Sequence, residues 1–261
     1  MFENTQELTP EQIEWLDKFT DGTWKINPRT GLVDVKGDFD CFRQDLTDFK
    51  GVKFGVVSGS FNCRNNQLTS LEGSPQEVGE HFSCSNNQLT SLVGAPQRVR
   101  SGFFCNNNQL TTLEGAPQKV GGYFECNGNQ ITSLKGAPQR VGGRFNCENN
   151  QLTTLEGAPQ KVDGYFYCGD NQLTSLEGAT LEIGRDYFYC ENNPVSVETL
   201  KSIFSLMKKG ESYIQAVETL WNEIPVEDQA LLYRPEFEWV SPEEVRKLEA
   251  LRAYQGFKGM I

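Results

Sequence analysis

Histidine is almost missing from this sequence, since His81 is the only one among 261 residues. Catalysis by a serine or cysteine that needs a histidine base therefore has a single possible base. The sequence also lacks a phosphate-binding loop and any of the usual metal-binding motifs. These gaps exclude the commonest enzyme classes. We expect no enzymatic activity, no metal and no cofactor.

Long apolar runs and a basic N-terminus are lacking as well. No segment approaches the roughly 18 apolar residues of a membrane-spanning helix. The acidic, polar start MFENTQELTPEQ is unlike a signal peptide. We therefore expect no membrane association and a cytoplasmic location. Basic residues number 24 against 35 acidic ones, for a net charge of −11, which argues against a nucleic-acid partner.

Cysteine is plentiful, but its spacing fits neither a zinc site nor a disulfide framework. Zinc ligands come in Cys-x₂₋₄-Cys pairs that converge on one point. Here the cysteines recur with a strict period of 21 from Cys63 to Cys168, and Cys41 and Cys190 extend the series, each one residue out of step. Such a column predicts small, buried, structural side chains. No oxidising compartment is implied.

The cysteines belong to a repeated phrase, Phe-x-Cys-x-x-Asn-Gln-Leu-Thr-Ser/Thr-Leu-x-Gly-Ala-Pro. A period in the low twenties is typical of a stacked repeat, and the phrase fits the leucine-rich-repeat core Leu-x-Leu-x-x-Asn-x-Leu. Strand alternation then points Phe124 and Cys126 inward, and Tyr123 and Glu125 outward. The Asn marks the turn after each strand, where its amide can bond backbone groups. The ladder is Asn66, Asn87, Asn108, Asn129, Asn150, Asn171 and Asn193.

The repeat length constrains the other side of each coil. Twenty-one residues are too few for a strand, two turns and a full helix, so we expect a polyproline-like or 3₁₀ return. Adjacent strands lie about 4.8 Å apart and packed helices roughly 8–10 Å apart. A solenoid without return helices should therefore curve only gently. The alternative architecture is a parallel β-helix, which tolerates similar coils; the Asn ladder favours the leucine-rich repeat.

The chain divides into three parts. Residues 1–35 are predicted to form an N-terminal cap, with a helix that starts at Thr9-Pro10 and ends at Asp21-Gly22, followed by a hairpin around 27–31. Residues 36–194 form the solenoid of eight coils. Residues 195–261 form an α-helical C-terminal cap, because a solenoid must cover its terminal coils. Its helices are predicted over 197–209, 213–223 and 241–254, with a short turn at 229–233.

The repeated Asn-Gln-Leu-Thr-Ser-Leu phrase with its Gly-Ala-Pro-Gln return resembles leucine-rich-repeat proteins of tailed-phage and some bacterial genomes. The resemblance covers the whole chain, including Trp-Lys-Ile-Asn-Pro at 24–28 and Leu-Lys-Ser-Ile-Phe-Ser-Leu-Met-Lys-Lys-Gly at 200–210. It implies architecture and no settled activity. The repeats are also similar to those of bacterial leucine-rich-repeat ubiquitin ligases. Those proteins carry a large catalytic domain with a nucleophilic cysteine, whereas here only 195–261 follow and no cysteine comes after Cys190.

Two sets of polar residues could suggest chemistry on the exposed strand face. His81 is expected there with Ser60 and Ser83 nearby, yet no acid is placed to orient its ring. Paired carboxylates of the glycosidase kind need a cleft and a raised pKa. Glu125 and Glu148, on neighbouring strands, are instead expected to be solvated.

The residues at the outward strand positions are informative, because nothing in the core dictates their identity. They divide the repeats into two halves. The first half is small and polar. The second half gathers aromatic residues with a rim of charge, which is the composition of a protein interface. The alternative is that aromatics merely suit strands and pack against the tail. The predicted partner-binding residues are Phe104, Tyr123, Arg144, Tyr165, Tyr167, Tyr187 and Tyr189.

The sequence therefore predicts a non-enzymatic protein-binding module. If the chain is phage-encoded, as the resemblance implies, the expected partner is a host or defence protein that it blocks in the host cytoplasm. A second hypothesis is a small-ligand binder whose tyrosines stack on a nucleotide or a sugar. A closed pocket over the tyrosines would favour the small ligand, since such sites are concave, and an open face would favour the protein.

Overall fold

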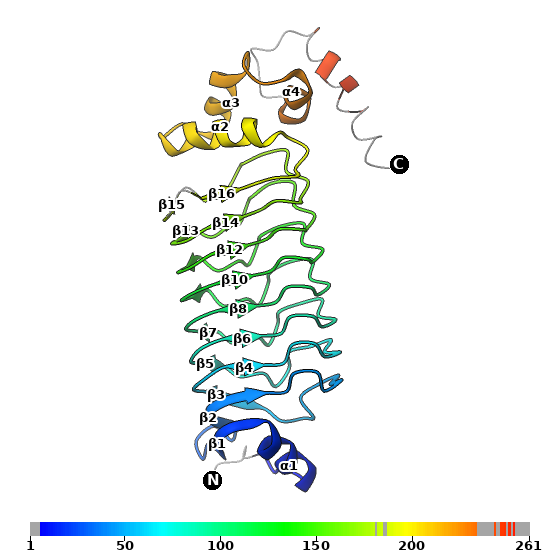
Figure 1. Ribbon diagram of the computed structural model, residues 1–261, viewed down its shortest axis with the longest axis vertical. Helices are drawn as coiled ribbons and strands as arrows, with labels where there is room; N and C mark the ends of the chain where they lie inside the picture. The colour runs from blue at the N-terminus through cyan, green and yellow to red at the C-terminus, as the bar shows by residue number, and fades with distance from the viewer. Residues whose placement is uncertain are drawn as a thin grey trace.

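The computed structural model describes residues 6–180, 182–184 and 187–233, together with 243, 246–248, 250–251 and 253. These residues form an elongated stack of coils with helices at its two ends (Figure 1). Within the repeats the strands pair in parallel and little helix is present, while helices follow at the C-terminal end. This is the leucine-rich-repeat-like solenoid that the sequence predicts.

Each Phe-x-Cys phrase forms a short front strand. The front strands pair in parallel, so that each Phe lies beside the Phe of the next coil; Phe124, for example, pairs with Phe103 and Phe145. Among the described residues the front strands are β2 (Val33–Asp40), β4 (Phe61–Asn62), β6 (Phe82–Ser83), β8 (Phe103–Phe104), β10 (Phe124–Glu125), β12 (Phe145–Asn146), β14 (Phe166–Tyr167) and β16 (Phe188–Tyr189).

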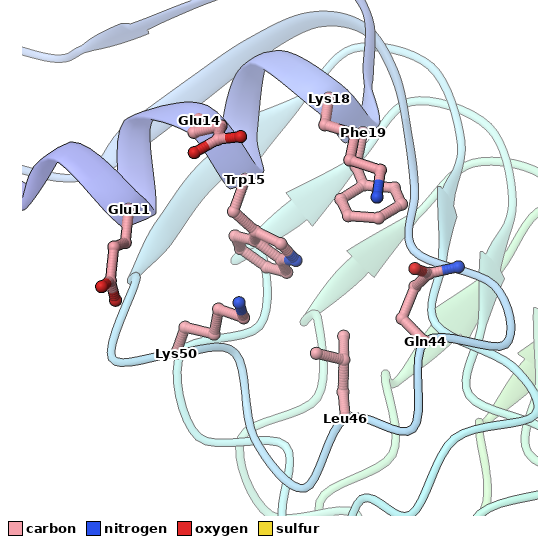
Figure 2. Close-up of a pocket in the computed structure, with 8 residues that line it drawn as sticks. All are labelled: Glu11, Glu14, Trp15, Lys18, Phe19, Gln44, Leu46 and Lys50. Atoms are coloured by element: carbon pink, nitrogen blue, oxygen red, sulfur yellow. The ribbon is translucent and has the colours of Figure 1, made fainter.

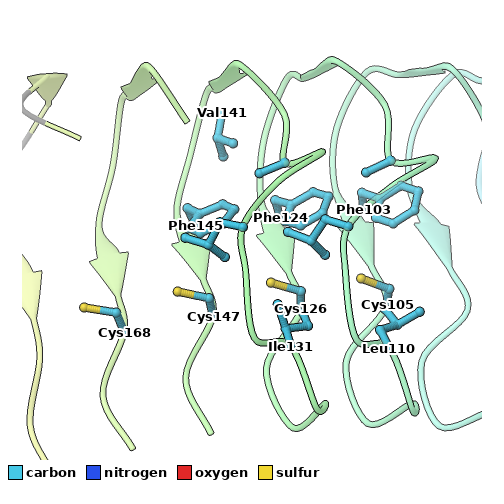
Figure 3. Close-up of a cluster of buried hydrophobic side chains, with 14 of the residues drawn as sticks. Phe103, Cys105, Leu110, Phe124, Cys126, Ile131, Val141, Phe145, Cys147 and Cys168 are labelled. Carbon is cyan, nitrogen blue, oxygen red and sulfur yellow. The ribbon is translucent and has the colours of Figure 1, made fainter. Parts of the chain in front are cut away.

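The core consists of columns that run the length of the stack. Figure 3 shows the rings of Phe103, Phe124 and Phe145 side by side in a row, one per coil, with the cysteines in a parallel row. The ring centroids of Phe103 and Phe124 are 5.4 Å apart and the rings are within 8° of parallel. All eight cysteines are buried and free. Burial raises the pKa of the Cys190 thiol, at the end of the column, to about 12, so the thiol stays protonated and unreactive.

A ladder of asparagines, most of them buried, connects successive coils, as the sequence predicts. The side-chain amide of Asn108 donates to the carbonyl oxygens of Cys84 and Cys105, each at 3.1 Å. Its Oδ1 accepts from the backbone N–H of Leu89 at 3.0 Å. One side chain thus satisfies three backbone groups at the turn, where no strand partner is available.

The residue before each ladder asparagine has a left-handed backbone. Its φ is +54° at Asn107 and +67° at Gly128. Asparagine and glycine tolerate this conformation better than other residues. The Asn-Asn pairs of the repeat therefore combine a turn-forming residue with a ladder residue.

The return side of each coil differs from the prediction. Instead of a polyproline or 3₁₀ segment, it contains short strands, of four residues in β3 and two in the others, that form a second parallel ladder joined to the front ladder through β2. These strands are β3 (Phe54–Val57), β5 (Glu77–Val78), β7 (Arg98–Val99), β9 (Lys119–Val120), β11 (Arg140–Val141), β13 (Lys161–Val162) and β15 (Glu182–Ile183). Both sides of the coil repeat at strand spacing. The stack is consequently almost straight (Figure 1).

The N-terminal cap is a helix followed by a hairpin, as predicted. Helix α1 (Pro10–Phe19) starts with a capping box between Thr9 and Gln12 and ends slightly earlier than expected. Trp15 closes the first coil, with its ring centroid 5.0 Å from that of Phe39. Strand β1 (Thr20–Ile26) then pairs with β2 in antiparallel register. Because β2 continues from the hairpin into the first coil, the expected boundary between residues 35 and 36 falls inside a strand.

The C-terminal cap contains α2 (Val197–Lys208), α3 (Tyr213–Leu220) and α4 (Val226–Leu232). The first helix matches its prediction to within one residue, the second ends three residues early, and the third is longer than the expected turn. Of the helix predicted over 241–254, the structure describes residues 243, 246–248, 250–251 and 253, and all of these are helical. Phe204 of α2 stacks on Phe188 of the last front strand, with centroids 4.5 Å apart. The helical cap therefore extends the phenylalanine column.

The cap helices are joined by a buried carboxylate. Asp228 of α4 is 3% exposed. It accepts from the backbone N–H of Ser196 at 3.1 Å and from the hydroxyl of Thr199 at 2.6 Å. A carboxylate at a helix N-terminus is favoured by the unpaired N–H groups there, so Asp228 fixes α4 against the start of α2.

Candidate interaction surface

The front strands present their outward side chains on one open face, and the two halves of that face differ. In the polar half, a hollow of about 420 Å³ lies over β4 to β8, with Asn62, His81, Ser83 and Phe104 in its lining. In the other half, aromatic rings stack from coil to coil.

The polar half contains no arrangement that would activate a nucleophile. His81 uses its Nδ1 to accept a hydrogen bond from the N–H of Gly102 at 3.0 Å. The hydroxyl of Ser60 accepts from the backbone N–H of His81 at 3.4 Å and donates to Glu80 at 3.3 Å. The imidazole therefore supports the backbone of the next coil, and Ser60 is engaged with groups other than the ring.

Four tyrosines form a compact group in the aromatic half, which we call the tyrosine quartet: Tyr165, Tyr167, Tyr187 and Tyr189. Tyr167 stacks on Tyr189 with centroids 4.7 Å apart and planes within 9°. Tyr165 stacks on Tyr187 at 4.9 Å, and the two stacks approach each other at 6.0 to 6.4 Å. Each ring thus covers one face of its partner, and the mutual packing restricts all four.

The quartet is open to solvent on its outer side. Tyr187 is 48% exposed, and the other three rings are half-buried. Partial burial, together with the neighbouring Tyr189, raises the pKa of Tyr167 above its ordinary value. The Tyr167 hydroxyl therefore remains protonated near pH 7 and can both donate and accept hydrogen bonds.

Beside the quartet lies a second group, made by Tyr123, Glu125 and Arg144. The guanidinium of Arg144 lies over the Tyr123 ring, 5.1 Å from its centroid, and its Nε donates to the carboxylate of Glu125. That hydrogen bond is the main reason why the pKa of Arg144 is raised above its ordinary value. Tyr123 itself is 48% exposed.

The expectation that Glu125 is solvated is wrong. Its side chain points outward from β10, as the alternation predicts, but only 5% of the residue is exposed. Arg144 pairs with it from the next coil, and a buried carboxylate needs such a partner. Glu125 is thus a positioning residue that the sequence analysis missed. The signal for it was a pair of opposite charges 19 residues apart, nearly one repeat.

Small residues make room for the aromatic rings. A side-chain carbon on Gly143 would lie 2.7 Å from the ring of Tyr123, and one on Gly102 would lie 2.6 Å from the ring of Phe104. Both distances are shorter than any real contact of this kind. These two glycines therefore leave room for an aromatic ring, of Tyr123 from the preceding coil at Gly143 and of Phe104 from the same coil at Gly102.

The seven predicted site residues fall into three groups along the face. The tyrosine quartet is one, and Tyr123 with Arg144 is the second. Phe104 stands apart, because it is three strands from Tyr167, roughly 14 Å at the usual strand spacing. It lies against His81, with centroids 5.7 Å apart, and lines the hollow of the polar half.

Carboxylates form the rim of the quartet. Glu148, Asp170 and Glu191 come from successive coils just after the strands. Partial burial raises the pKa of Glu148, and the neighbouring carboxylates of Asp170 and Glu191 add to the rise. Asp170 accepts a hydrogen bond from Asn192 at 2.8 Å. The rim gives this end of the face a local negative charge.

A further hollow, of about 330 Å³, lies at the N-terminal cap. Figure 2 shows it between α1 and the loop of the first coil, and its lining includes the cations Lys18 and Lys50 and the carboxylates Glu11 and Glu14. The indole N–H of Trp15 is buried there without a hydrogen-bond partner. Opposite charges are balanced around this hollow, so its lining favours no ligand of one sign.

Over the described part of the chain, no cluster of three or more histidine, cysteine or acidic side chains is arranged to hold a metal ion. No helix in the same part is long and apolar enough to span a membrane. Comparisons with protein-family models, with curated proteins and with solved structures found no match.

Proposed function

We propose that this protein is a non-enzymatic protein-binding module, and that its binding site is the aromatic half of the front face. The site comprises the tyrosine quartet together with Tyr123 and Arg144. The observation that carries the proposal is the quartet itself: four tyrosines stacked in two pairs on an open face, with Tyr187 48% exposed.

The composition of the surface supports a protein partner. Tyrosine and arginine are enriched among the residues that contribute most binding energy in interfaces. Here the rings of the tyrosine quartet are already held in place by stacking, and the guanidinium of Arg144 is held by Glu125. A partner that covers them therefore orders few additional side chains, which lowers the entropic cost of association.

The shape of the surface favours a protein over a small ligand. A nucleotide or a sugar stacks on a free ring face and is usually enclosed by a pocket. Tyr167 and Tyr189 cover each other's inner faces, and the hollow on this side of the molecule lies over the polar half. A flat partner surface can cover ring edges and hydroxyls together.

The resemblance to tailed-phage repeat proteins guides the choice of partner. In this proposal the protein acts in the host cytoplasm, where it binds and blocks a host or defence protein. The eight free, buried cysteines support a reducing location.

The test is affinity capture from a lysate of the native host with three immobilised proteins. These are the wild type, Tyr167→Ala with Tyr189→Ala, and Asn62→Ala with Ser83→Ala from the polar half. We expect the wild type and the Asn62/Ser83 variant to retain the same partner, and the tyrosine variant to lose it. Truncating a tyrosine anchor commonly costs about 2 kcal/mol or more.

Thermal unfolding of the three proteins serves as the control. The mutual stacking of Tyr167 and Tyr189 is worth about 1 kcal/mol, so the tyrosine variant should unfold at a slightly lower temperature but remain folded at the temperature of capture. The proposal fails if the tyrosine variant retains the partner, or if the Asn62/Ser83 variant loses it.

A further inference from the structure

The return side of the solenoid carries a column of basic residues, which lies outside the binding site proposed on the front face. In β7, β9, β11 and β13 one outward position precedes a buried valine; it is exposed in the first three strands and half-buried in β13. In four successive coils it holds Arg98, Lys119, Arg140 and Lys161, which we call the basic column. Register pairs Arg140 with both Lys119 and Lys161, so neighbouring cations repeat at about 4.8 Å.

Acidic residues form ion pairs with the basic column only at its two ends. Arg98 forms an ion pair with Glu77 in the preceding coil, and Lys161 pairs with Glu182 in the following coil at 3.4 Å. In the part of the chain that the structure describes, Lys119 and Arg140 take part in no ion pair. Like charges on adjacent strands repel one another, so an external anion would stabilise the middle of the column.

A groove lies over the first part of the same side. Its volume is about 650 Å³, and its lining includes Val56, Arg98, Arg100 and Lys119. Val56 is 41% exposed, which provides an apolar contact beside three cations. The chain as a whole has a net charge of −11, so this concentration of positive charge is a local feature.

We propose that the return-side groove and the basic column bind an acidic helical segment of a protein, which lies along the solenoid axis. A helix with carboxylates at every turn repeats at about 5.4 Å, close to the spacing of the cations. The mismatch over three steps is roughly 2 Å, which long arginine and lysine side chains can absorb. An apolar residue of the helix would cover Val56.

The ends of the column favour a protein segment over a nucleic acid. The cations span four strands, roughly 14 Å, and Glu77 and Glu182 flank them on either side. A longer polyanion would meet these carboxylates and be repelled. A short acidic helix fits between them. This surface is formed by the return strands, whereas the tyrosine quartet lies on the front strands, and the inference does not depend on the proposed function of the front face.

The probe for a direct test is a short fluorescent helical peptide with glutamates at every turn and leucines along one side. A second peptide with glutamine in place of each glutamate is the charge control. We expect the wild-type protein to bind the glutamate peptide and not the glutamine peptide, with an affinity that falls as salt is raised.

Two protein variants locate the site. The variant Arg98→Gln, Arg100→Gln, Lys119→Gln removes three charges from the groove, whereas Lys25→Gln, Lys135→Gln, Lys201→Gln removes three exposed charges elsewhere. We expect the first to lose about tenfold in affinity, since each exposed pair contributes modestly, and the second to bind as the wild type does. Both should unfold near the wild-type temperature.

The proposal is overturned if the wild type fails to bind the glutamate peptide or binds both peptides equally. It is also overturned if the groove variant binds as well as the wild type, or if the control variant loses affinity to the same extent. Binding of a single-stranded oligonucleotide in preference to the acidic peptide would assign the column to nucleic acid instead.

Discussion

The polar and aromatic halves of the front face stand on the same core. Phe82 in the polar half and Phe145 in the aromatic half are both fully buried and occupy equivalent places in the phenylalanine column. The outward residues of these strands differ: Ser83 follows Phe82, whereas Tyr167 follows Phe166, whose strand pairs with that of Phe145. The comparison shows that the repeat fixes its inner residues and leaves the outer ones free to vary.

The outward side chains also differ in what they contact. In the polar half they bond to one another, as in the hydrogen bonds of Ser85 with Asn106 at 2.5 Å and of Asn107 with Asn86 at 2.9 Å. In the aromatic half, rings stack and leave apolar surface facing water. A polar surface that satisfies itself gains little from a partner, whereas an exposed aromatic one gains from being covered.

The largest effect is expected from removing residues 196–261, which border the aromatic half. Phe204 covers Phe188, and each Å² of apolar surface that is uncovered costs about 25 cal/mol. We expect the truncated protein to aggregate or dimerise, as measured by light scattering after size-exclusion chromatography. A stable monomer would mean that the repeats need no cover at this end and that the tail is a separate functional domain.

Replacing an asparagine of the ladder is expected to have the next largest effect on stability. It also tests whether both halves share one core. Asn108→Ala leaves three buried backbone groups without their partner, which should lower the free energy of unfolding by about 3 kcal/mol or more. Asn150→Ala, the equivalent change in the aromatic half, should cost the same. Asn127→Ala, at a half-exposed position on the strand face, is the control and should cost less than about 1 kcal/mol. Chemical denaturation measures all three. Unequal losses for Asn108 and Asn150 would show that the halves do not share one core.

Two ion pairs, one with a buried carboxylate and one exposed, allow their contributions to stability to be compared. Glu125→Gln removes the carboxylate that holds Arg144, and Glu77→Gln removes the one that pairs with Arg98. Because Glu125 is 5% exposed, we expect its loss to cost about 1–2 kcal/mol of stability, whereas the exposed pair should cost less than about 1 kcal/mol. Equal effects in thermal unfolding would contradict the assignment of Glu125 as a positioning residue.

Most of the fold could be predicted because each core feature is repeated. The period of Phe, Cys and Asn predicts the front strands, the columns and the ladder, and the caps carry ordinary helix signals such as Thr9-Pro10. The return strands could not be predicted, since two residues are too short for a periodic pattern. The burial of Glu125 depends on a diagonal contact with Arg144 in the next coil, and strand alternation alone gives only the direction of its side chain.

The smallest effect concerns Glu148 at the rim of the quartet. Partial burial raises its pKa, so the folded protein binds the proton more tightly than the unfolded chain does. Stability should therefore fall as pH rises from the ordinary glutamate range through the raised pKa. Glu148→Gln removes this penalty and should stabilise the protein at pH 7 by less than about 1 kcal/mol, after allowance for solvent screening.

The gain from Glu148→Gln should shrink in acid, where the wild-type carboxyl is protonated. Thermal unfolding across about pH 3–8 measures the trend. This range extends from about one unit below the ordinary glutamate pKa of about 4.3 to several units above it. Glu114→Gln, at an exposed loop position of another repeat, controls for the loss of one negative charge. A gain that is constant with pH would argue against burial as the cause.

Hydroxyl-radical footprinting of the free protein and of its complex with the captured partner tests the central claim most directly. The account predicts that Tyr165, Tyr167, Tyr187 and Tyr189 oxidise more slowly in the complex, while His81 in the polar half oxidises at an unchanged rate. Protection of His81 with unchanged oxidation of the tyrosine quartet would contradict it.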